Sequence, residues 1–236
     1  MKTLIRATRV GSLRLTLIAF AVLALPLTAQ SLNEVFARMD RTAPQFKAVT
    51  GDLKRDVHTA VVNDDAIDSG TIRLKRDNPH QVKMLIDFTA PDPKTVSFDG
   101  ANVSIYYPKI KTVQVYDVGQ HRDLIDQFLL LGFGATGSEL RSTYDVTLVG
   151  NETIAGQATS HVQLVPKSKE ALQRLKEAEL WISDATGLPA QQKFVTSSTG
   201  DFTLVTYSNL KLNPSLADNS LKLNLPKGVQ IEHPQR

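Results

Sequence analysis

The sequence predicts a mainly β domain whose strands run antiparallel. Apolar and polar residues alternate over many short segments, which is the two-residue period of a half-buried strand. Turn-forming residues such as Asn63-Asp64-Asp65 and Asp99-Gly100 separate these segments. Parallel neighbours would need crossover helices, and no helical pattern stands between the strands from Phe46 to Tyr116. We expect ten or eleven strands and two helices in one domain.

Residues 1–29 are typical of a secretory signal peptide. The segment starts with basic residues, continues as an apolar run from Leu15 to Leu25, and ends on small residues at Ala29. A membrane anchor is the alternative, but the run is shorter than the roughly 20 residues that a bilayer span needs. We therefore expect export, cleavage after Ala29, and a single domain over residues 30–236.

The composition of the remaining chain excludes several classes of function. Four of the 27 Lys and Arg residues, and no acidic residue, lie in the leader, so residues 30–236 carry 23 basic and 24 acidic residues. A nucleic-acid partner needs a basic footprint, and none is present. The chain has no cysteine, which excludes disulfides, thiol catalysis, cysteine-ligated metal and a lipid-modified N-terminal cysteine.

A short helix is predicted at the start of the domain. Ser31-Leu32-Asn33-Glu34 matches a capping box, in which the serine and the glutamate each bond the other's backbone N–H. Apolar residues then recur at helical spacing, and Pro44 ends the pattern. This stripe consists of Leu32, Val35, Phe36 and Met39.

Alternating strands follow the first helix. Residues 70–76 place Ile72 and Leu74 on one face, and the next strand has the cleanest alternation of the chain. After Asp99-Gly100, one face of a further strand carries Val103 and Ile105 together with Tyr107. The apolar face of the cleanest strand consists of Val82, Met84, Ile86 and Phe88.

A second helix is predicted over residues 121–131, where a broad apolar arc includes Leu124, Phe128 and Leu131. Strands are expected to resume with the alternating residues Leu140, Ser142, Tyr144, Val146 and Leu148, followed by Val162 and Leu164. Residues 168–176 are predicted to form a short polar helix or arm. The last strands are expected around residues 180–182, 194, 202–204 and 221–225. Trp181 shares a strand face with Glu179 and Ser183, which predicts a half-exposed ring.

No motif predicts catalysis, a cofactor or a metal. Residues 132–137 match GxGxxG, but a helix precedes these glycines and a strand follows, the reverse of a dinucleotide site. They are better interpreted as a helix stop and a loop. The five histidines are scattered without local ligand spacing, and no G-x-S-x-G elbow is present.

Arg76 ends the strand that carries Ile72 and Leu74 and has the same parity. It therefore either places a cation at the rim of an apolar cavity or, as an edge arginine, extends its charge into water.

Five segments resemble one family when taken in order along the chain. The chain resembles the periplasmic outer-membrane lipoprotein carriers (LolA) and the LolA-like lipoprotein-sorting proteins. The matching segments are residues 70–76 (GTIRLKR), Asp99-Gly100 with residues 105–108 (IYYP), residues 161–167 (HVQLVPK), residues 180–184 with 186–189 (LWISD, TGLP), and residues 223–229 (LNLPKGV).

The resemblance implies an incomplete antiparallel β-barrel of about eleven strands with a helical lid. It also implies a periplasmic, non-enzymatic and monomeric carrier, which takes acylated lipoproteins from an inner-membrane ABC release complex to an outer-membrane receptor. Arg76 matches the family arginine that ties the lid shut, although Asp77 and Asn78 precede Pro79 here, where the family has proline directly. The candidate lipid-cavity residues are Ile72, Leu74, Val82, Met84, Ile86, Phe88, Val103, Ile105, Leu124, Phe128 and Leu131.

Two alternatives to the carrier stay open on the sequence. A LolA-like lipid-binding sensor of the cell envelope would use the same cavity and act through a protein partner. An exported hydrolase would need a catalytic site assembled from residues that are distant in the sequence.

Overall fold

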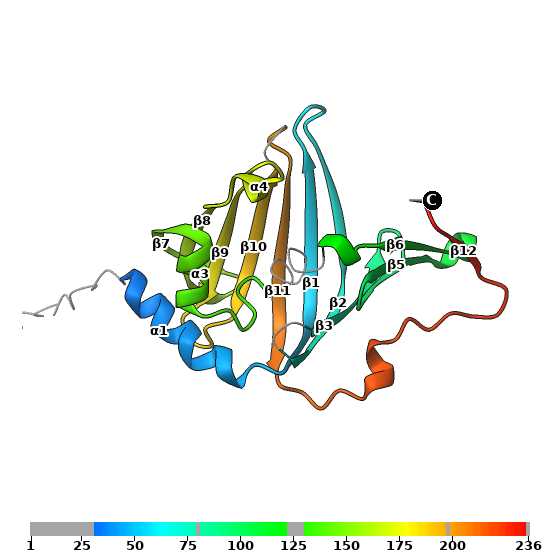
Figure 1. The fold of residues 1–236 in the computed structure, drawn as a ribbon, viewed down its shortest axis with the longest axis horizontal. Coiled ribbons are helices and arrows are strands. Elements are labelled where there is room, and N and C mark those ends of the chain that lie inside the picture. Colours follow the sequence, from blue (N-terminus) through cyan, green and yellow to red (C-terminus); the bar gives the residue numbers. More distant parts are fainter. Residues whose placement is uncertain (1–30, 79–80, 122–129, 197–198, 235–236) are drawn as a thin grey trace, which may run out of the picture.

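The computed structural model describes residues 31–78, 81–121, 130–196 and 199–234. Within these ranges, twelve strands form one sheet in the order β12-β6-β5-β4-β3-β2-β1-β11-β10-β9-β8-β7 (Figure 1). The sheet has two ends, β7 and β12, and is not closed into a barrel. The predicted mainly β, incompletely closed antiparallel fold is confirmed, with twelve strands in place of about eleven.

The elements have the following bounds. The helices are α1 (Leu32–Thr42), α3 (Gly137–Thr143) and α4 (Lys169–Leu172), with 3₁₀ turns η1 (Ala43–Gln45), η2 (Pro108–Ile110), η3 (Gly119–His121) and η4 (Asp218–Leu221). The strands are β1 (Ala48–Thr59), β2 (Asp64–Asn78), β3 (Gln81–Ala90), β4 (Lys94–Asp99), β5 (Asn102–Tyr107), β6 (Thr112–Asp117), β7 (Tyr144–Ile154), β8 (Gln157–Pro166), β9 (Leu175–Ser183), β10 (Pro189–Thr196), β11 (Phe202–Leu212) and β12 (Gln230–Glu232).

The sheet consists of two meanders joined in the middle. Strands β1 to β6 are consecutive neighbours, and so are β7 to β11. β1 pairs with β11 along its length, with Leu53 opposite Tyr207 and His58 opposite Phe202. Because this pairing joins segments about 150 residues apart, local sequence patterns do not predict it. β12 runs parallel to β6, whereas the other pairs of described strands are antiparallel.

Two hydrophobic clusters lie on the inner face of the sheet. Side chains of α1 pack with those of β8 and β9 in the first cluster, where Val35, Leu164 and Leu180 are fully buried. The second cluster is formed around β1, β2 and β3 and includes Phe46 and Phe133. We call the two regions the helix-covered half and the cavity half of the sheet.

The chain after β11 covers part of the opposite face. It runs below the sheet in Figure 1, forms η4 and returns to pair as β12. Leu221 at the end of η4 is buried, and η4 contacts β3, where Leu85 is buried on the outer side. The predicted strand around residues 221–225 is wrong, because this segment packs its leucine on the sheet instead of adding a strand.

Two further local predictions are also wrong. Residues 137–143 form α3 rather than a strand, because Thr136 and Glu139 make a capping box that starts a helix. Trp181 is 6% exposed rather than half-exposed, since its ring stacks on His161 with centroids 4.1 Å apart. The predicted helix over residues 121–131 lies mostly outside the described residues.

The predicted first helix agrees with the structure. Ser31 caps α1, its side chain accepts from Glu34 N–H, and Glu34 accepts from Ser31 N–H at 2.8 Å. Val35, Phe36 and Met39 form the buried face of α1 as the helical spacing predicted. None of the described helices has the length and apolar character needed to span a membrane.

Candidate functional site

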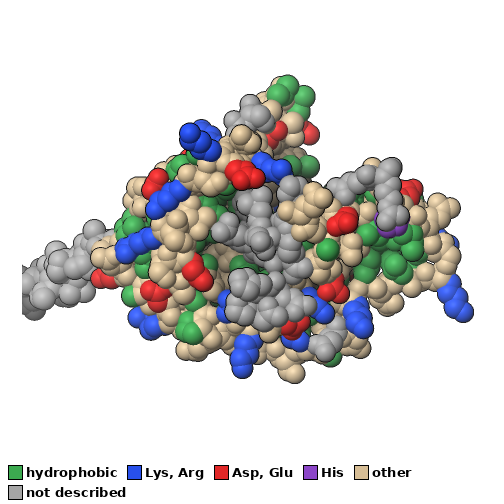
Figure 2. Space-filling model, in the orientation of Figure 1, with side chains coloured by type: hydrophobic (Ala, Val, Ile, Leu, Met, Phe, Trp, Pro, Cys, Tyr) green, Lys and Arg blue, Asp and Glu red, His purple; other side chains and the backbone are tan. Residues whose placement is uncertain are grey.

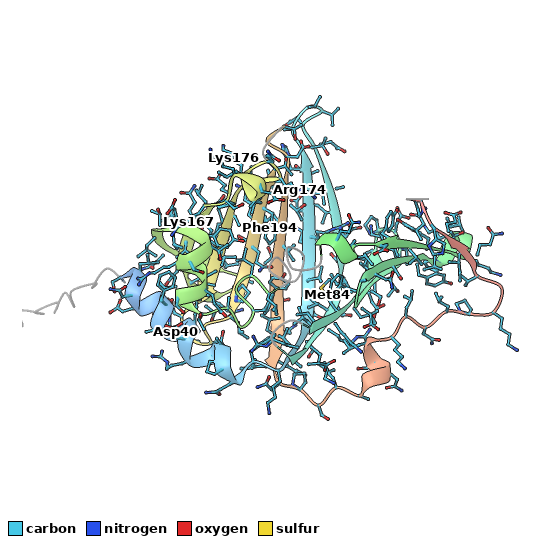
Figure 3. All side chains as sticks on the ribbon, viewed as in Figure 1. Asp40, Met84, Lys167, Arg174, Lys176 and Phe194 are labelled. Atoms are coloured by element: carbon cyan, nitrogen blue, oxygen red, sulfur yellow. The ribbon has the colours of Figure 1, made fainter. Side chains whose placement is uncertain are left out.

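A cavity of about 470 Å³ opens on the inner face of the cavity half. Its volume falls within the roughly 300–1,000 Å³ of pockets that hold small organic ligands. Figure 3 labels Met84 on β3 and Phe194 on β10, which line it from the two meanders. Further apolar or aromatic lining comes from Leu53, Phe133, Leu175, Val205 and Tyr207.

Five of the residues predicted from the sequence line this cavity, and they come from β2 and β3. The register pairs Ile72 with Ile86 and Leu74 with Met84, so their side chains share one face of the sheet. Phe88, at the far end of β3, completes this wall. Alternation predicted the shared face of these side chains, whereas the cavity itself was implied by the family resemblance.

The other predicted residues have different places. Val82 is buried in the same cluster without lining the cavity, and Val103 packs against that cluster from β5. Ile105 is half-buried on β5 and does not line the cavity. Leu131 belongs to the cluster under α1. Leu124 and Phe128 lie outside the described residues.

The opposite wall and the floor were not predicted as part of the site. They come from β1, β10, β11 and the loop around Phe133. Each of these strands alternates, which is the signal that marks an inner face. What the sequence lacks is a local sign of the β1 and β11 pairing that brings Leu53, Val205 and Tyr207 to the same cavity.

A buried polar network forms the floor. Tyr207 donates its hydroxyl to Gln192 Oε1 at 2.6 Å, and Gln192 Nε2 donates to the carbonyl of Leu131. The ring of Phe133 lies edge-on to Tyr207, with centroids 5.1 Å apart. Burial raises the pKa of Tyr207, which keeps the phenol neutral. The network fixes residues 131–133 against the sheet without placing a charge in the floor.

Arg76 ties three backbone carbonyls together. Its Nη2 donates to Ala43 O at 2.8 Å and to Phe46 O at 2.9 Å, and its Nη1 donates to Gly134 O at 3.2 Å. Gly134 has a φ of +78°, and a Cβ there would lie 2.8 Å from the ring of Phe46. The guanidinium thus joins the segment between α1 and β1 to the loop before α3.

The end of the cavity nearest the β1–β2 turn carries charge. Arg55 and Lys94 both bind Asp68, Lys94 at 2.9 Å. Both cations also lie over the ring of Phe88, at 4.7 and 5.1 Å from its centroid. Burial opposes ionisation of Asp68, but the hydrogen bonds and charges of Lys94 and Arg55 outweigh it and lower the pKa of Asp68.

Polar contacts hold α1 in place over the helix-covered half. Arg38 donates to Asp184 at 2.9 Å and to Ser160 at 2.8 Å. Asp40, labelled at the lower end of α1 in Figure 3, accepts from Gly137 N–H at 2.7 Å. α1 is therefore fixed by hydrogen bonds to the sheet and to α3 as well as by its apolar face.

The described residues contain no group of three or more His, Asp or Glu side chains placed to hold a metal ion. His161 is buried on the outer face, and its ring nitrogens bind Glu152 and Glu179 at 2.9 and 2.7 Å. On the face that Figure 2 shows, basic and acidic side chains are interspersed without an extended patch of one sign.

The sequence matches the family model described as outer membrane lipoprotein carrier protein LolA over residues 45–224, well over half of the chain. The chain belongs to the LolA family. The resemblance found in the sequence motifs is thereby confirmed. No curated protein matches the sequence.

Solved structures are similar to this chain at low sequence identity, two of them with a TM-score of 0.50. MucB is 16% identical with a TM-score of 0.50, and the match covers 81% of this chain and 62% of MucB. An uncharacterised conserved protein from Thermus thermophilus is 12% identical with a TM-score of 0.50, covering 86% and 99%. The Mycobacterium tuberculosis lipoprotein LppX is 14% identical with a TM-score of 0.47, covering 80% and 100%. This chain thus spans less than two thirds of MucB.

Proposed function

We propose that this LolA family member is a periplasmic carrier that binds lipoprotein acyl chains and catalyses no reaction. The observation that carries the proposal is the cavity, whose walls from β1, β2, β3, β10 and β11 are mostly apolar. Such a surface recognises a ligand through burial of hydrocarbon rather than through directed polar contacts.

The size of the cavity suits a cargo that must be released. Three acyl chains of about sixteen carbons would contribute some 36 kcal/mol at roughly 0.8 kcal/mol per CH₂, well beyond any usable affinity. If each carbon takes roughly the 30 Å³ that a water molecule occupies in the liquid, the cavity of about 470 Å³ holds about one such chain. Burying one chain contributes about 12 kcal/mol before the costs of ordering it. If the protein covers only part of a larger lipid in this way, the complex stays weak enough to release its cargo.

Arg76 fits a latch in this mechanism. Its three acceptor carbonyls belong to the segment that links α1 to β1 and to the loop that carries Phe133. Both segments border the cavity half, and Phe133 lines the cavity. Breaking these bonds would let the two segments separate and enlarge the opening.

The partners of the proposed function are acylated lipoproteins, an inner-membrane ABC release complex that loads the carrier, and an outer-membrane receptor that unloads it. The chain would act as a monomer in the periplasm after cleavage of residues 1–29.

Mass spectrometry of the protein purified from periplasm tests the proposal. We expect acyl-bearing lipoproteins to copurify with the natural sequence. Ile86→Glu should abolish this, because it places a carboxylate on the half-buried cavity wall. Ile231→Glu is the matched control, since Ile231 is exposed on β12. Recovery of a signalling protein without lipoproteins would favour the sensor alternative, and equal lipid recovery from both variants would refute binding in this cavity.

A further inference from the structure

The charged residues that line the cavity all have the same sign. Among its described lining residues, Arg55 and Arg174 are the charged ones, and no acidic side chain is present. The remaining polar lining consists of Tyr207 and Gln192 in the floor and of Thr196 and Thr203. Arg55 has a structural role through its ion pair with Asp68, whereas burial of hydrocarbon alone gives Arg174 no role at this cavity.

The cations and the two threonines lie toward one end of the sheet. His58 near the end of β1 pairs with Phe202 at the start of β11, and Phe202 pairs with Val195 near the end of β10. Thr196 then pairs with Leu175 at the start of β9, directly after Arg174. Figure 3 shows Arg174 at this end, beside α4 and above Phe194. The cavity therefore has an apolar interior and a cationic end.

Arg174 lines the cavity with an exposed side chain. It makes no ion pair or side-chain hydrogen bond in the described part of the chain. Lys176, labelled beside it in Figure 3, is also exposed.

Arg55 can bind a second anion while it keeps its hydrogen bonds to Asp68. Its Nε and Nη2 donate to Asp68 Oδ2, the Nε contact being 3.1 Å, and Nη1 has no acceptor among the described residues. Asp68 has a second cation, Lys94, on its other carboxylate oxygen. A ligand anion that drew Arg55 away would thus leave Asp68 paired rather than buried alone.

We propose that this cationic end binds the negative head group of an amphiphile, a carboxylate or a phosphate, whose acyl chain fills the cavity. The inference rests on the acyl-chain binding of the proposed function, and it adds a free anionic lipid to the ligands of the same cavity, because the ester- and amide-linked acyl chains of a lipoprotein carry no anionic head group. Guanidinium groups match both anions through paired, charge-assisted hydrogen bonds. A neutral acyl chain of equal length would leave both cations without a ligand.

The experiment measures affinities of the full chain without residues 1–29 for four probes by titration calorimetry. Palmitate and hexadecanol have the same chain and differ in head-group charge, lysophosphatidylglycerol carries a phosphate, and inorganic phosphate has no chain. We expect palmitate to bind about tenfold more tightly than hexadecanol, because a tenfold gain in affinity is what one charge-assisted contact contributes at a partly exposed site. The two anionic lipids show which head group is preferred, and phosphate alone should bind weakly or not at all.

Two variants assign the difference to the proposed residues. Arg174→Gln should remove most of the preference for palmitate and leave the affinity for hexadecanol unchanged, and Arg55→Gln should act in the same direction. Lys227→Gln is the control, because it removes an exposed charge from the C-terminal segment, outside the cavity lining. Higher salt should reduce the preference, since it screens exposed charges.

The outcomes separate this inference from the proposed function. Equal binding of palmitate and hexadecanol, or an equal loss of both in Arg174→Gln, would overturn the head-group site and leave acyl-chain binding intact. Failure of every lipid to bind would overturn the proposed function itself. Tight binding of inorganic phosphate alone would show an anion site that is independent of lipid and would also overturn the inference.

Discussion

The two halves of the inner face are built from the same kind of strand but are filled differently. Over β8 and β9, the alternating apolar residues meet Val35, Phe36 and Met39 of α1 and form a closed core. Over β1, β2 and β3, comparable residues border a cavity of about 470 Å³. An apolar sheet face needs a cover, and here the chain provides α1 for one half while the cavity half offers the same surface to a ligand.

The first prediction compares the packing of the two halves and has the largest expected effect. Phe36→Ala should lower the free energy of unfolding by about 3–5 kcal/mol, because the ring is buried among α1, α3 and the sheet. Ile86→Ala should cost less than about 1 kcal/mol, since this half-buried side chain borders empty space. Urea denaturation of both variants measures the difference. Equal losses would show that the cavity half is packed as tightly as the other.

The second prediction tests the latch at the border of the cavity. Arg76→Leu leaves the carbonyls of Ala43, Phe46 and Gly134 without their donor, which should cost about 2 kcal/mol of unfolding free energy. In this proposal the bonds of Arg76 favour the closed state and so oppose cargo binding. Their loss should therefore favour the open state and slow the release of cargo to acceptor vesicles.

The control for the latch is Arg76→Lys, which keeps the charge but cannot reach all three acceptors in the same planar arrangement. Its free energy of unfolding and its rate of cargo release should lie between those of Arg76→Leu and those of the natural sequence. Transfer at the natural rate from the loaded Arg76→Leu protein would argue against a latch, even if the protein were less stable.

The sequence predicts the elements of both halves better than their junction. The capping box at Ser31, the stripe of α1 and the inner faces of β2 and β3 follow from spacing within a few residues. The pairing of β1 with β11, which creates the second cavity wall, depends on contacts between distant segments. The same holds for Arg76, whose face was predicted from parity. Its acceptors come from two other places in the chain, Ala43 and Phe46 before β1 and Gly134 before α3.

Buried polar groups were harder to predict for a different reason. Gln192 and Tyr207 lie on alternating strands among apolar residues, and nothing in the sequence distinguishes them from solvent-facing polar residues. Asp68 is a similar case, because its burial depends on Arg55 and Lys94 from two other strands.

The last prediction concerns the cationic end of the cavity half and has the smallest expected effect. The pKa of Asp68 is lowered in the folded protein from its usual 3.8, so the folded state binds this proton less readily than the unfolded chain. The carboxylate therefore stabilises the protein at pH values above about 4, and this contribution is lost as the pH falls through the lower folded pKa. Asp68→Asn should have a lower free energy of unfolding at pH 7 than the natural sequence. Its free energy of unfolding should also decline less steeply between about pH 5 and 2.

Chemical denaturation at several pH values measures the effect, and Asp145→Asn is the control, because Asp145 is exposed on β7 in the other half. An identical pH profile in Asp68→Asn and the natural sequence would contradict the assignment.

The same variant also bears on the head-group site, since it frees Arg55 and Lys94 from their shared acceptor. If the cationic end binds anions, Asp68→Asn should raise the affinity for palmitate while it lowers the free energy of unfolding. If the ion pair is purely structural, the affinity and the free energy of unfolding should both fall.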